Sequence, residues 1–362
     1  MEEMKKYILG DVCSRLSSGK GISSEEVFEK GPFPVIGGNG LRGYAMKSNF
    51  SGECGVIGRQ GANCGNVRFF SGEAYMTEHA VVVVGNERAD TRYLTFLLST
   101  MHLGNLSAQS AQPGLSVKTL AKQEIMLPSL QEQKRRASIL ASLEDKIDLN
   151  NRINHNLQEQ ARLSFEEWCS NCSDLKAIKE LANNILDYTP NPHSKVILLN
   201  SSDVTEGRFD VIPYVDNVNL KGQFKKRFKK GDVLYSEIRP RNHHYAICYF
   251  DSTDYIASTR LMVIRRNPEL VPSDALLYQY LLRPQVLDEF TSKTESRSGT
   301  FPQGNYEDLS SSEVPYSSEN GIIAKTLDDL YASIWSNLEE NKRLESLRDT
   351  LLPLLMTGHF TC

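Results

Sequence analysis

In the middle of the chain, leucine, isoleucine and asparagine residues recur at steps of three and four, separated by mostly polar residues. The recurring positions are Leu140, Leu143, Ile147, Asn150, Asn154 and Leu157. Such steps bring side chains to one face of an α-helix, and their alternation is the heptad pattern of a coiled coil. The pattern predicts one continuous helix over residues 131–168 whose seam packs against a partner.

The same pattern returns near the end of the chain. The equivalent positions are Leu327, Leu330, Ile334, Asn337, Asn341 and Leu344, each 187 residues after its counterpart. A constant offset leaves no room for an insertion or a deletion, as expected for a helix whose contacts must stay in phase. A second long helix is predicted over residues 319–356.

The two helices are predicted to pair with each other. A buried asparagine costs stability, but it favours the one register in which its amide finds a partner. Because both copies carry asparagine on the seam, we expect an antiparallel coiled coil within one chain. The alternative is that each segment is an ordinary amphipathic surface helix. The expected seam consists of Leu140, Leu143, Ile147, Asn154, Leu157, Leu327, Leu330, Ile334, Asn341 and Leu344.

The segment before each helix has the pattern of an α+β domain. "GECGVIGRQGANCGNVRFF" in the first and "GDVLYSEIRPRNHHYAICYF" in the second are strand-like runs interrupted by Gly, Asn and Pro turns. Each segment then leads through a short apolar helix to a strand that closes on Leu-Pro or Val-Pro. The expected fold is α+β. Mixed β-sheets with short helices occupy residues 1–130 and 169–318, and the helices at 131–168 and 319–356 separate them.

Length and composition agree with two domains. A chain of 362 residues with 40% hydrophobic residues can bury two cores. The net charge of -4 provides no global basic field, so nucleic acid would have to be held by local patches. Seven cysteines and the absence of a signal sequence in "MEEMKKYILGDV" favour free thiols in a reducing cytoplasm. No apolar run approaches the roughly 20 residues that span a bilayer, so no membrane partner is expected.

Three phrases of the sequence resemble one known family. They are "LPSLQEQ" at the start of the first helix, "LSFEEWC" at its end and "LRDTLLPLLMTGHF" at the end of the second. Over essentially its whole length, the chain resembles the specificity subunits of type I restriction-modification systems. The resemblance implies that each globular domain is a target recognition domain and that the helices are the spacers between them. The sequence departs from the pattern at "VPYSSEN", which stands where the first copy has "LPSLQEQ".

The resemblance also implies partners. Such a subunit would bind double-stranded DNA at a bipartite, asymmetric site and recruit two methylation subunits and, in the full complex, restriction subunits. No cofactor or metal is expected on this chain, because S-adenosylmethionine, ATP and Mg²⁺ would be held by the partner subunits. Recognition domains vary among these proteins, so individual base contacts are not carried over.

Motifs for nucleotide hydrolysis and methyl transfer are incomplete. "RLSSGKGIS" lacks the leading Gly of a P-loop and the hydroxyl residue after Lys20. "NPHS" has His193 and Ser194 where an amino-methylating loop that grips a flipped base has a second Pro and an aromatic residue. The sequence therefore favours a DNA binder over a catalyst.

Two further groups point only weakly to chemistry. Asp232 and Glu237 are spaced loosely like nuclease carboxylates, but Arg239 stands where such a site needs Lys. Cys169 and Cys172 have metal or redox spacing, yet they stand without a second pair or a neighbouring His. Two small free thiols at a helix end are the expected outcome.

A basic segment is the strongest candidate for contact with phosphates. "LKGQFKKRFKKGD" contains no acid before Asp232, and Phe224 and Phe228 interrupt its charges. Clustered cations neutralise phosphates and release counterions, which makes affinity salt-dependent. The alternative, a solvated hairpin whose phenylalanines pack inward, is compatible with this role. The basic residues are Lys221, Lys225, Lys226, Arg227, Lys229 and Lys230.

Candidate base readers lie in loops that are rich in Gly, Asn, Gln and Arg. Arg matches the acceptors of guanine, Asn and Gln match adenine, and glycine lets the backbone approach closely. For any one of these residues, a polar turn or a structural hydrogen bond is an equally good interpretation. The first domain offers Asn39, Arg42, Tyr44, Arg59, Gln60, Asn63, Asn66, Gln109, Ser110 and Gln112. The second offers Arg239, Arg241, Asn242, His243, Lys293, Arg297 and Ser298.

Two other functions stay open. One is a catalytic DNA-processing protein with its own active site, which methylation or cleavage by the purified chain would support. The other is a stand-alone protein-interaction scaffold, which a lack of DNA binding even beside a methylation partner would support. The sequence gives neither the DNA motif nor the spacing between its halves.

Overall fold

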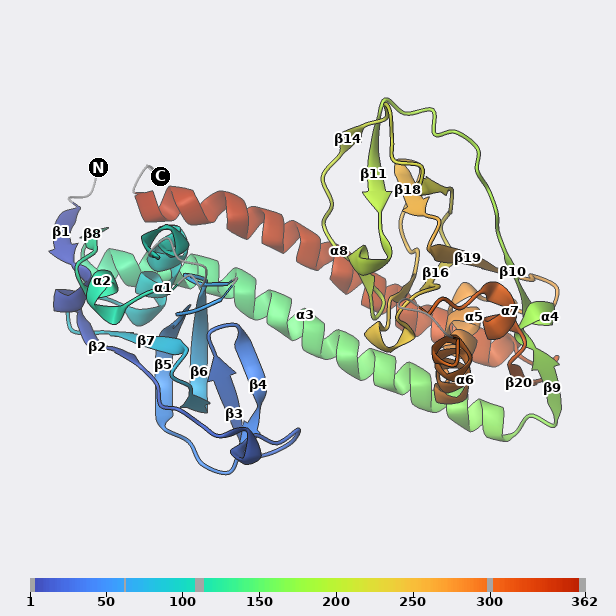
Figure 1. The fold of residues 1–362 in the computed structure, drawn as a ribbon, viewed down its shortest axis with the longest axis horizontal. Coiled ribbons are helices and arrows are strands. Elements are labelled where there is room, and N and C mark those ends of the chain that lie inside the picture. Colours follow the sequence, from blue (N-terminus) through green and yellow to red (C-terminus); the bar gives the residue numbers. More distant parts are fainter. Residues whose placement is uncertain (1–3, 62, 108–113, 298–301, 358–362) are drawn as a thin grey trace. The chain divides into compact units, whose positions relative to one another are not determined.

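The computed structural model describes residues 4–61, 63–107, 114–297 and 302–357. The chain divides into two compact units, of which the first comprises Met1–Leu149 with Glu340–Cys362 and the second comprises Asn150–Glu339. Each unit contains its own sheet structure and a part of each long helix (Figure 1). Within the described residues, no helix is long and apolar enough to cross a membrane.

The first unit is built on a six-stranded sheet in the order β2-β7-β5-β6-β3-β4. Neighbouring strands are antiparallel except for β3 and β6, which are parallel. Helix α1 (Thr91–Ser99) begins at Asp90, whose carboxylate accepts a hydrogen bond from Tyr93 N, and it packs with Ile57 of the sheet and Leu140 in one core. The strands are β2 (Cys13–Ser18), β3 (Phe33–Gly37), β4 (Gly40–Ala45), β5 (Phe50–Gly58), β6 (Val67–Met76) and β7 (Ala80–Gly85).

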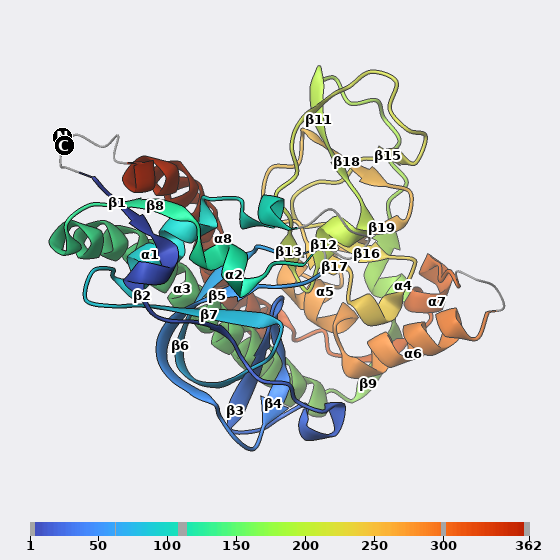
Figure 2. The same cartoon turned by 60° about the vertical axis from the view of Figure 1, so that its left-hand side comes forward.

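The second unit contains two four-stranded sheets, β10-β19-β16-β17 and β14-β11-β18-β15, with a small pair β12-β13 (Figure 1 and Figure 2). Its strands are β10 (Ala182–Asn184), β11 (Lys195–Leu199), β12 (Val204–Thr205), β13 (Arg208–Phe209), β14 (Val215–Asp216), β15 (Phe224–Lys226), β16 (Val233–Ser236), β17 (Tyr245–Ile247), β18 (Tyr255–Ser258) and β19 (Leu261–Arg266). Its short helices are α4 (Ile178–Leu181), α5 (Asp274–Leu281), α6 (Pro284–Glu295) and α7 (Tyr306–Ser310).

The two units share one strand arrangement. The antiparallel order β2-β7-β5-β6 in the first unit has the same connections as β10-β19-β16-β17 in the second, and α1 and α5 follow the equivalent strands β7 and β19. A two-stranded ribbon precedes each long helix. It pairs β1 (Lys5–Ile8) with β8 (Glu124–Leu127), after α2 (Val117–Ala121), and β9 (Asp174–Ala177) with β20 (Glu313–Tyr316). The chain is therefore a structural as well as a sequence repeat.

Both predicted long helices are continuous. Helix α3 runs from Leu130 to Ser170 and α8 from Gly321 to Thr357, about 60 and 55 Å at about 1.5 Å per residue. In the first unit, Arg136 contacts Leu355 and Lys146 pairs with Glu340, so contacts on α8 move backwards as those on α3 advance. This confirms the α+β fold and the antiparallel packing of the two helices.

The seam contains an asparagine pair in the second unit, in which Asn154 is buried and Asn337 is half-buried. Asn154 donates from Nδ2 to the carbonyl of Ile334 at 3.3 Å and accepts from Nδ2 of Asn337 at 2.8 Å. Asn337 is the repeat counterpart of Asn150, so the amide partner of Asn154 is not its own counterpart, Asn341. Of the expected seam, Leu140, Ile147, Asn154, Leu327, Ile334 and Asn341 are buried, and Leu143, Leu157, Leu330 and Leu344 are half-buried.

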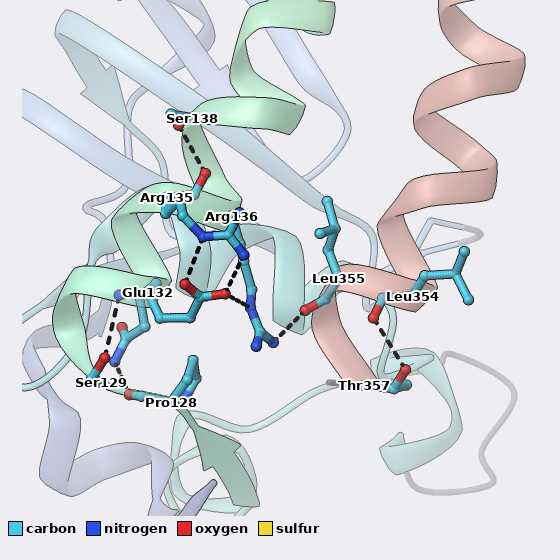
Figure 3. Close-up of polar contacts among 10 residues, drawn as sticks. Pro128, Ser129, Glu132, Arg135, Arg136, Ser138, Leu354, Leu355 and Thr357 are labelled. Carbon is cyan, nitrogen blue, oxygen red and sulfur yellow. Dashed lines mark hydrogen bonds and ion pairs between the residues drawn. The ribbon is translucent and has the colours of Figure 1, made fainter. Parts of the chain in front are cut away.

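The phrase "LPSLQEQ" builds the start of α3 in the first unit (Figure 3). Glu132 accepts hydrogen bonds from Arg135 and Arg136, and the Arg135 hydrogen bond is the main reason that its pKa falls to about 2. Arg136 is buried and donates from its guanidinium to the carbonyl of Leu355 at 2.8 Å, near the end of α8. Glu132 of this phrase thus positions Arg136, which connects the start of α3 to the end of α8.

Candidate nucleic-acid interface

Two candidate loops of the first unit meet at the edge of its sheet. Asn63, in the β5–β6 connection, donates from Nδ2 to Oδ1 of Asn39 at 2.6 Å, and Asn39 lies in the β3–β4 turn. Arg68 donates from its guanidinium to the carbonyl of Asn39 at 2.9 Å. We call this group the first loop cluster. It consists of Asn39, Arg42, Arg59, Gln60, Asn63, Asn66 and Arg68.

Glycine makes this close approach possible. A Cβ atom on Gly38 would lie 3.2 Å from the Cα of Gly58, and one on Gly58 would lie 2.6 Å from the carbonyl oxygen of Gly38. Gly40 has φ of +105°, in a region that side chains rarely occupy. The glycines therefore fix the spacing between the two loops, as the sequence pattern indicated.

The first loop cluster is exposed and positive. All its members are exposed except Arg59, which is half-buried. No Asp or Glu occurs between Glu29 and Glu53 or between Glu53 and Glu73. Within the described part of the chain, Arg42, Arg59 and Arg68 take part in no ion pair. Their charges are thus available to an anionic partner.

The remaining first-domain candidates lie at the edge of this group or outside the described residues. Tyr44 is half-buried on β4, where its backbone pairs with that of Phe28. Gln109, Ser110 and Gln112 fall outside the described residues. Arg68 was missed by the sequence analysis, although its position two residues after Asn66, in the same Gly- and Asn-rich connection, is a signal that could have found it.

In the second unit, four lysines of the basic segment are exposed. They are Lys221, Lys225, Lys229 and Lys230. Phe224 and Phe228 are buried, as the inward-packing alternative expected, but the segment is not a hairpin, because β15 pairs with β18 and β16 belongs to the other sheet. A row of exposed ammonium groups on an anchored backbone is a suitable surface for phosphates.

Lys226 and Arg227 differ from the expected arrangement. Lys226 is 3% exposed, donates from Nζ to the carbonyl of Leu261 at 2.7 Å and lies 3.7 Å from the carboxylate of Glu237. Burial lowers its pKa, while Glu237 opposes that change. Arg227 is half-buried and donates to the carbonyl of Thr253 at 2.9 Å. Neither side chain is displayed toward solvent as the exposed lysines are.

Asp232 ends the basic segment and is fully buried. It accepts two hydrogen bonds from Arg265, at 2.6 and 2.8 Å, and one from the backbone N–H of Lys229 at 2.8 Å. All these contacts hold the turn in place. The structure does not support a nuclease role for Asp232 and Glu237, because the carboxylate of Asp232 is hydrogen-bonded to Arg265 and to the backbone of Lys229.

Replacing Asp232 by Ala is expected to lower the free energy of unfolding by about 3 kcal/mol, because it leaves the guanidinium of Arg265 and the N–H of Lys229 without their acceptor. Arg265 is about one-third exposed, so solvation keeps the loss near the lower end of the usual range. Urea denaturation measures it. The matched control is Asp210→Ala, at an exposed acid of the same unit, which should change stability by less than about 0.5 kcal/mol. Equal stability of the two variants would contradict this account.

Several second-domain candidates already have partners within the unit. Arg241 forms a two-point pair with Glu295 at 2.6 and 2.7 Å, and His243 contacts the carboxylate of Glu206 at 2.9 Å. Arg297 pairs with Asp308 at 2.9 Å, and Lys293 donates to the hydroxyl of Ser311 at 2.8 Å. Arg239 and Asn242 are exposed, and Ser298 lies outside the described residues. The partnered side chains fit the structural alternative stated for them.

Cys169 lies in the last turn of α3, which ends at Ser170, and Cys172 follows two residues later. Both are free thiols, and burial raises the pKa of Cys169 to about 12. Across the described residues, no group of three or more His, Cys, Asp or Glu side chains is placed to hold a metal ion.

Comparison with known proteins points to one family. The sequence matches the family described as "Type I restriction modification DNA specificity domain" over residues 1–159 and 195–346. It is 38% identical over 150 residues to the EcoprrI type I restriction enzyme specificity subunit of Escherichia coli, covering 40% of this chain and 36% of that protein. It is 34% identical over 163 residues to the HindI specificity subunit of Haemophilus influenzae, covering 44% and 35%. These matches span little more than a third of either relative.

The fold is similar to that of a solved structure, the S subunit of a type I restriction-modification system from M. genitalium. The TM-score is 0.63 at 14% sequence identity, and the similarity covers 98% of this chain and 96% of that one. At 14% sequence identity, this comparison supports the fold alone and not a shared function. The sequence match, in contrast, includes both units and most of both long helices. The chain therefore belongs to the type I restriction-modification DNA specificity family.

Proposed function

We propose that this chain is the DNA-specificity subunit of a type I restriction-modification complex. It binds a bipartite, asymmetric site on double-stranded DNA, reads one half with each globular domain and performs no catalytic step itself. The recognition domains are residues 1–130 and 169–318, and the helices over 131–168 and 319–356 are the spacers.

The observation that carries this proposal is the duplication. Each unit contains the same order of four antiparallel strands. In each, a ribbon pairs a strand that precedes the sheet with a strand that leads into a long helix. Two equivalent sheets on a pair of continuous helices suit a DNA site with two halves at a fixed separation. A single catalytic centre would not need this arrangement.

Family membership supports a proposal for the partners and cofactors. The chain recruits two methylation subunits, which hold S-adenosylmethionine, and restriction subunits, which use ATP and Mg²⁺. It works in the cytoplasm, where its DNA substrate is. The two curated relatives are themselves named as specificity subunits of type I restriction enzymes.

Within this function, the first loop cluster reads bases and the exposed lysines of the second unit contact phosphates. The cluster presents amides and guanidinium groups together, which are the donors and acceptors that distinguish base pairs in the major groove. The lysines carry no sequence information, but they fix the position of the protein on the duplex.

Methylome sequencing tests the proposal directly. Cells that express this chain with its methylation subunits should contain one methylated motif in two parts, and cells without this chain should lack it. Methylation or cleavage by the purified chain alone would refute the non-catalytic role. Methylation that persists unchanged without the chain would refute the specificity role.

Changing Lys221, Lys225, Lys229 and Lys230 to Ala is expected to weaken binding to specific and unrelated DNA alike. Each lost phosphate contact removes about 0.9 from the slope of log K against log salt, so the slope should fall by up to about four. Fluorescence anisotropy over a salt series measures it.

The control for that experiment removes the same charge elsewhere. Lys122, Lys134, Lys179 and Lys325 are also exposed, and none belongs to the basic segment. Their replacement by Ala should leave the salt slope nearly unchanged. If the basic-segment variant lost only specific binding and kept its slope, the lysines would be base readers instead.

A further inference from the structure

The first loop cluster is built on a junction of three chain segments. At the end of β5, Arg59 donates from its backbone N to the carbonyl of His79 at 3.0 Å, in the turn before β7. Its own carbonyl accepts from the backbone N of Leu115 at 2.9 Å, and Gln60 pairs with Gly114 beside it.

The second unit has the same junction at the end of β16. Glu237 donates from its backbone N to the carbonyl of Arg260 at 2.9 Å, in the turn before β19, and accepts from the backbone N of Gly304 at 2.8 Å. Ile238 pairs with Gln303 beside it. Because β16 and β19 are the counterparts of β5 and β7, this is the equivalent of the place where the first unit gathers its loop cluster.

A chain of polar side chains crosses this second junction from the core to the surface. Lys226, buried, lies 3.7 Å from the carboxylate of Glu237. Glu237 accepts a hydrogen bond from Nε2 of Gln303 at 2.7 Å. The side-chain oxygen Oε1 of Gln303 accepts a hydrogen bond from the guanidinium of Arg260. Glu237 therefore fixes which end of the Gln303 amide faces Arg260.

Arg260 is exposed and has no acidic partner among the described residues. The neighbouring candidates Arg241 and Arg297 are each neutralised by a carboxylate, whereas Arg260 forms no ion pair with any described residue. One NH₂ group of Arg260 is held by Gln303, and its other donors remain for a ligand. An exposed, oriented and unneutralised guanidinium is poor as a structural element but well suited to an anionic or acceptor-rich partner.

We infer that Arg260 is a base-reading residue of the second unit, that it recognises guanine, and that Gln303 is its positioning residue. This inference rests on the proposed function and deepens it. The guanidinium fork matches the O6 and N7 acceptors of guanine in the major groove. Neither residue was a candidate from the sequence, because their junction joins segments that are far apart in the chain.

The test compares Arg260→Ala and Arg260→Lys with the wild-type chain, each in complex with its methylation subunits. The measurement is the methylated motif selected from a randomised DNA library, together with affinity for the wild-type site. We expect Arg260→Ala to lose the preference for guanine at one position of one half-site and Arg260→Lys to weaken that preference, since Lys keeps the charge but not the fork. Both variants should keep the other half, and the affinity of Arg260→Ala for the wild-type site should fall about 5- to 150-fold.

Gln303→Ala should relax the same position and no other. If Gln303 acts through Arg260, the double variant should be no worse than Arg260→Ala alone, whereas independent contacts would add. The matched control is Arg208→Ala, at an exposed arginine of the same unit outside the junction, which should leave the motif intact.

The outcomes separate this inference from the proposed function. An unchanged motif in the Arg260 variants would overturn the inference and leave the function standing. So would an equal loss on all DNA sequences, as for a phosphate contact. Relaxation at an adenine position would overturn the assignment to guanine. A wild-type complex that selected no motif would refute the function itself.

Discussion

Lengthening both long helices by one heptad is expected to leave the protein folded and to abolish methylation at its native sites. The insertions belong between Leu149 and Asn150 in α3 and between Glu339 and Glu340 in α8, where one compact unit ends and the next begins. Seven added residues preserve the seam on each side, because the heptad is the repeat of the pattern. They separate the contacts of the two units by about 10.5 Å at about 1.5 Å per residue.

That distance corresponds to about three base pairs of DNA, given about 34 Å for a helical turn of ten. A heptad returns the helix face nearly to its starting direction, whereas three base pairs turn the second half-site by about 100°. The best site should therefore have a longer gap and a lower affinity than the native one. Selection from a DNA library with gaps of varied length measures both quantities.

The control lengthens α3 alone. Each unit contains a part of both helices, so α3 would then be seven residues longer than α8 between the two units. Some seam side chains would therefore lose their packing partners on the other helix. Exposing two large apolar side chains costs about 3 to 6 kcal/mol in free energy of unfolding. If the double insertion kept the native gap preference, or if the single insertion were as stable as wild type, the helices would not act as a paired spacer.

The long helices were predictable because their signal is local and repeated. Each seam position recurs within four residues, and a second copy with a constant offset confirms the phase of the first. The helix bounds consequently agree within two residues. The repeat could not predict which asparagine pairs with Asn154. Its pairing with Asn337 depends on the axial register of the two helices, which the sequence does not give.

The site was predictable only in part. Phe224, Lys226 and Phe228 are all buried, but strand alternation could not have predicted this: β15 ends at Lys226 and its register shifts between Phe224 and Lys226. Phe224 and Phe228 also pack into different cores, which only the folded chain shows. The partners of Arg241 and Arg297 lie in other segments, and Gln303 is remote in sequence from Glu237, so only the folded chain shows which charges are satisfied.

Exchanging the first recognition domain for that of a related protein is expected to replace one half of the methylated motif and preserve the other. The structure sets the limits of the graft. Strand β1 pairs with β8, so the exchange should end after Leu127 and carry both strands together. The core of the first unit also contains Leu355 and Met356 from the end of α8. A second version of the graft should therefore carry residues 351–357 of the donor as well.

The expected result is complete loss of methylation at native sites and a new motif whose second half is unchanged. The reason is that the loops of the second unit, including the junction at Glu237, lie wholly outside the exchanged residues. Methylome sequencing decides the outcome, and a thermal melt of each version shows whether the graft is folded. A folded graft that changed both halves together, or a native motif that proved to be one continuous palindrome, would mean that the two units do not read separate half-sites.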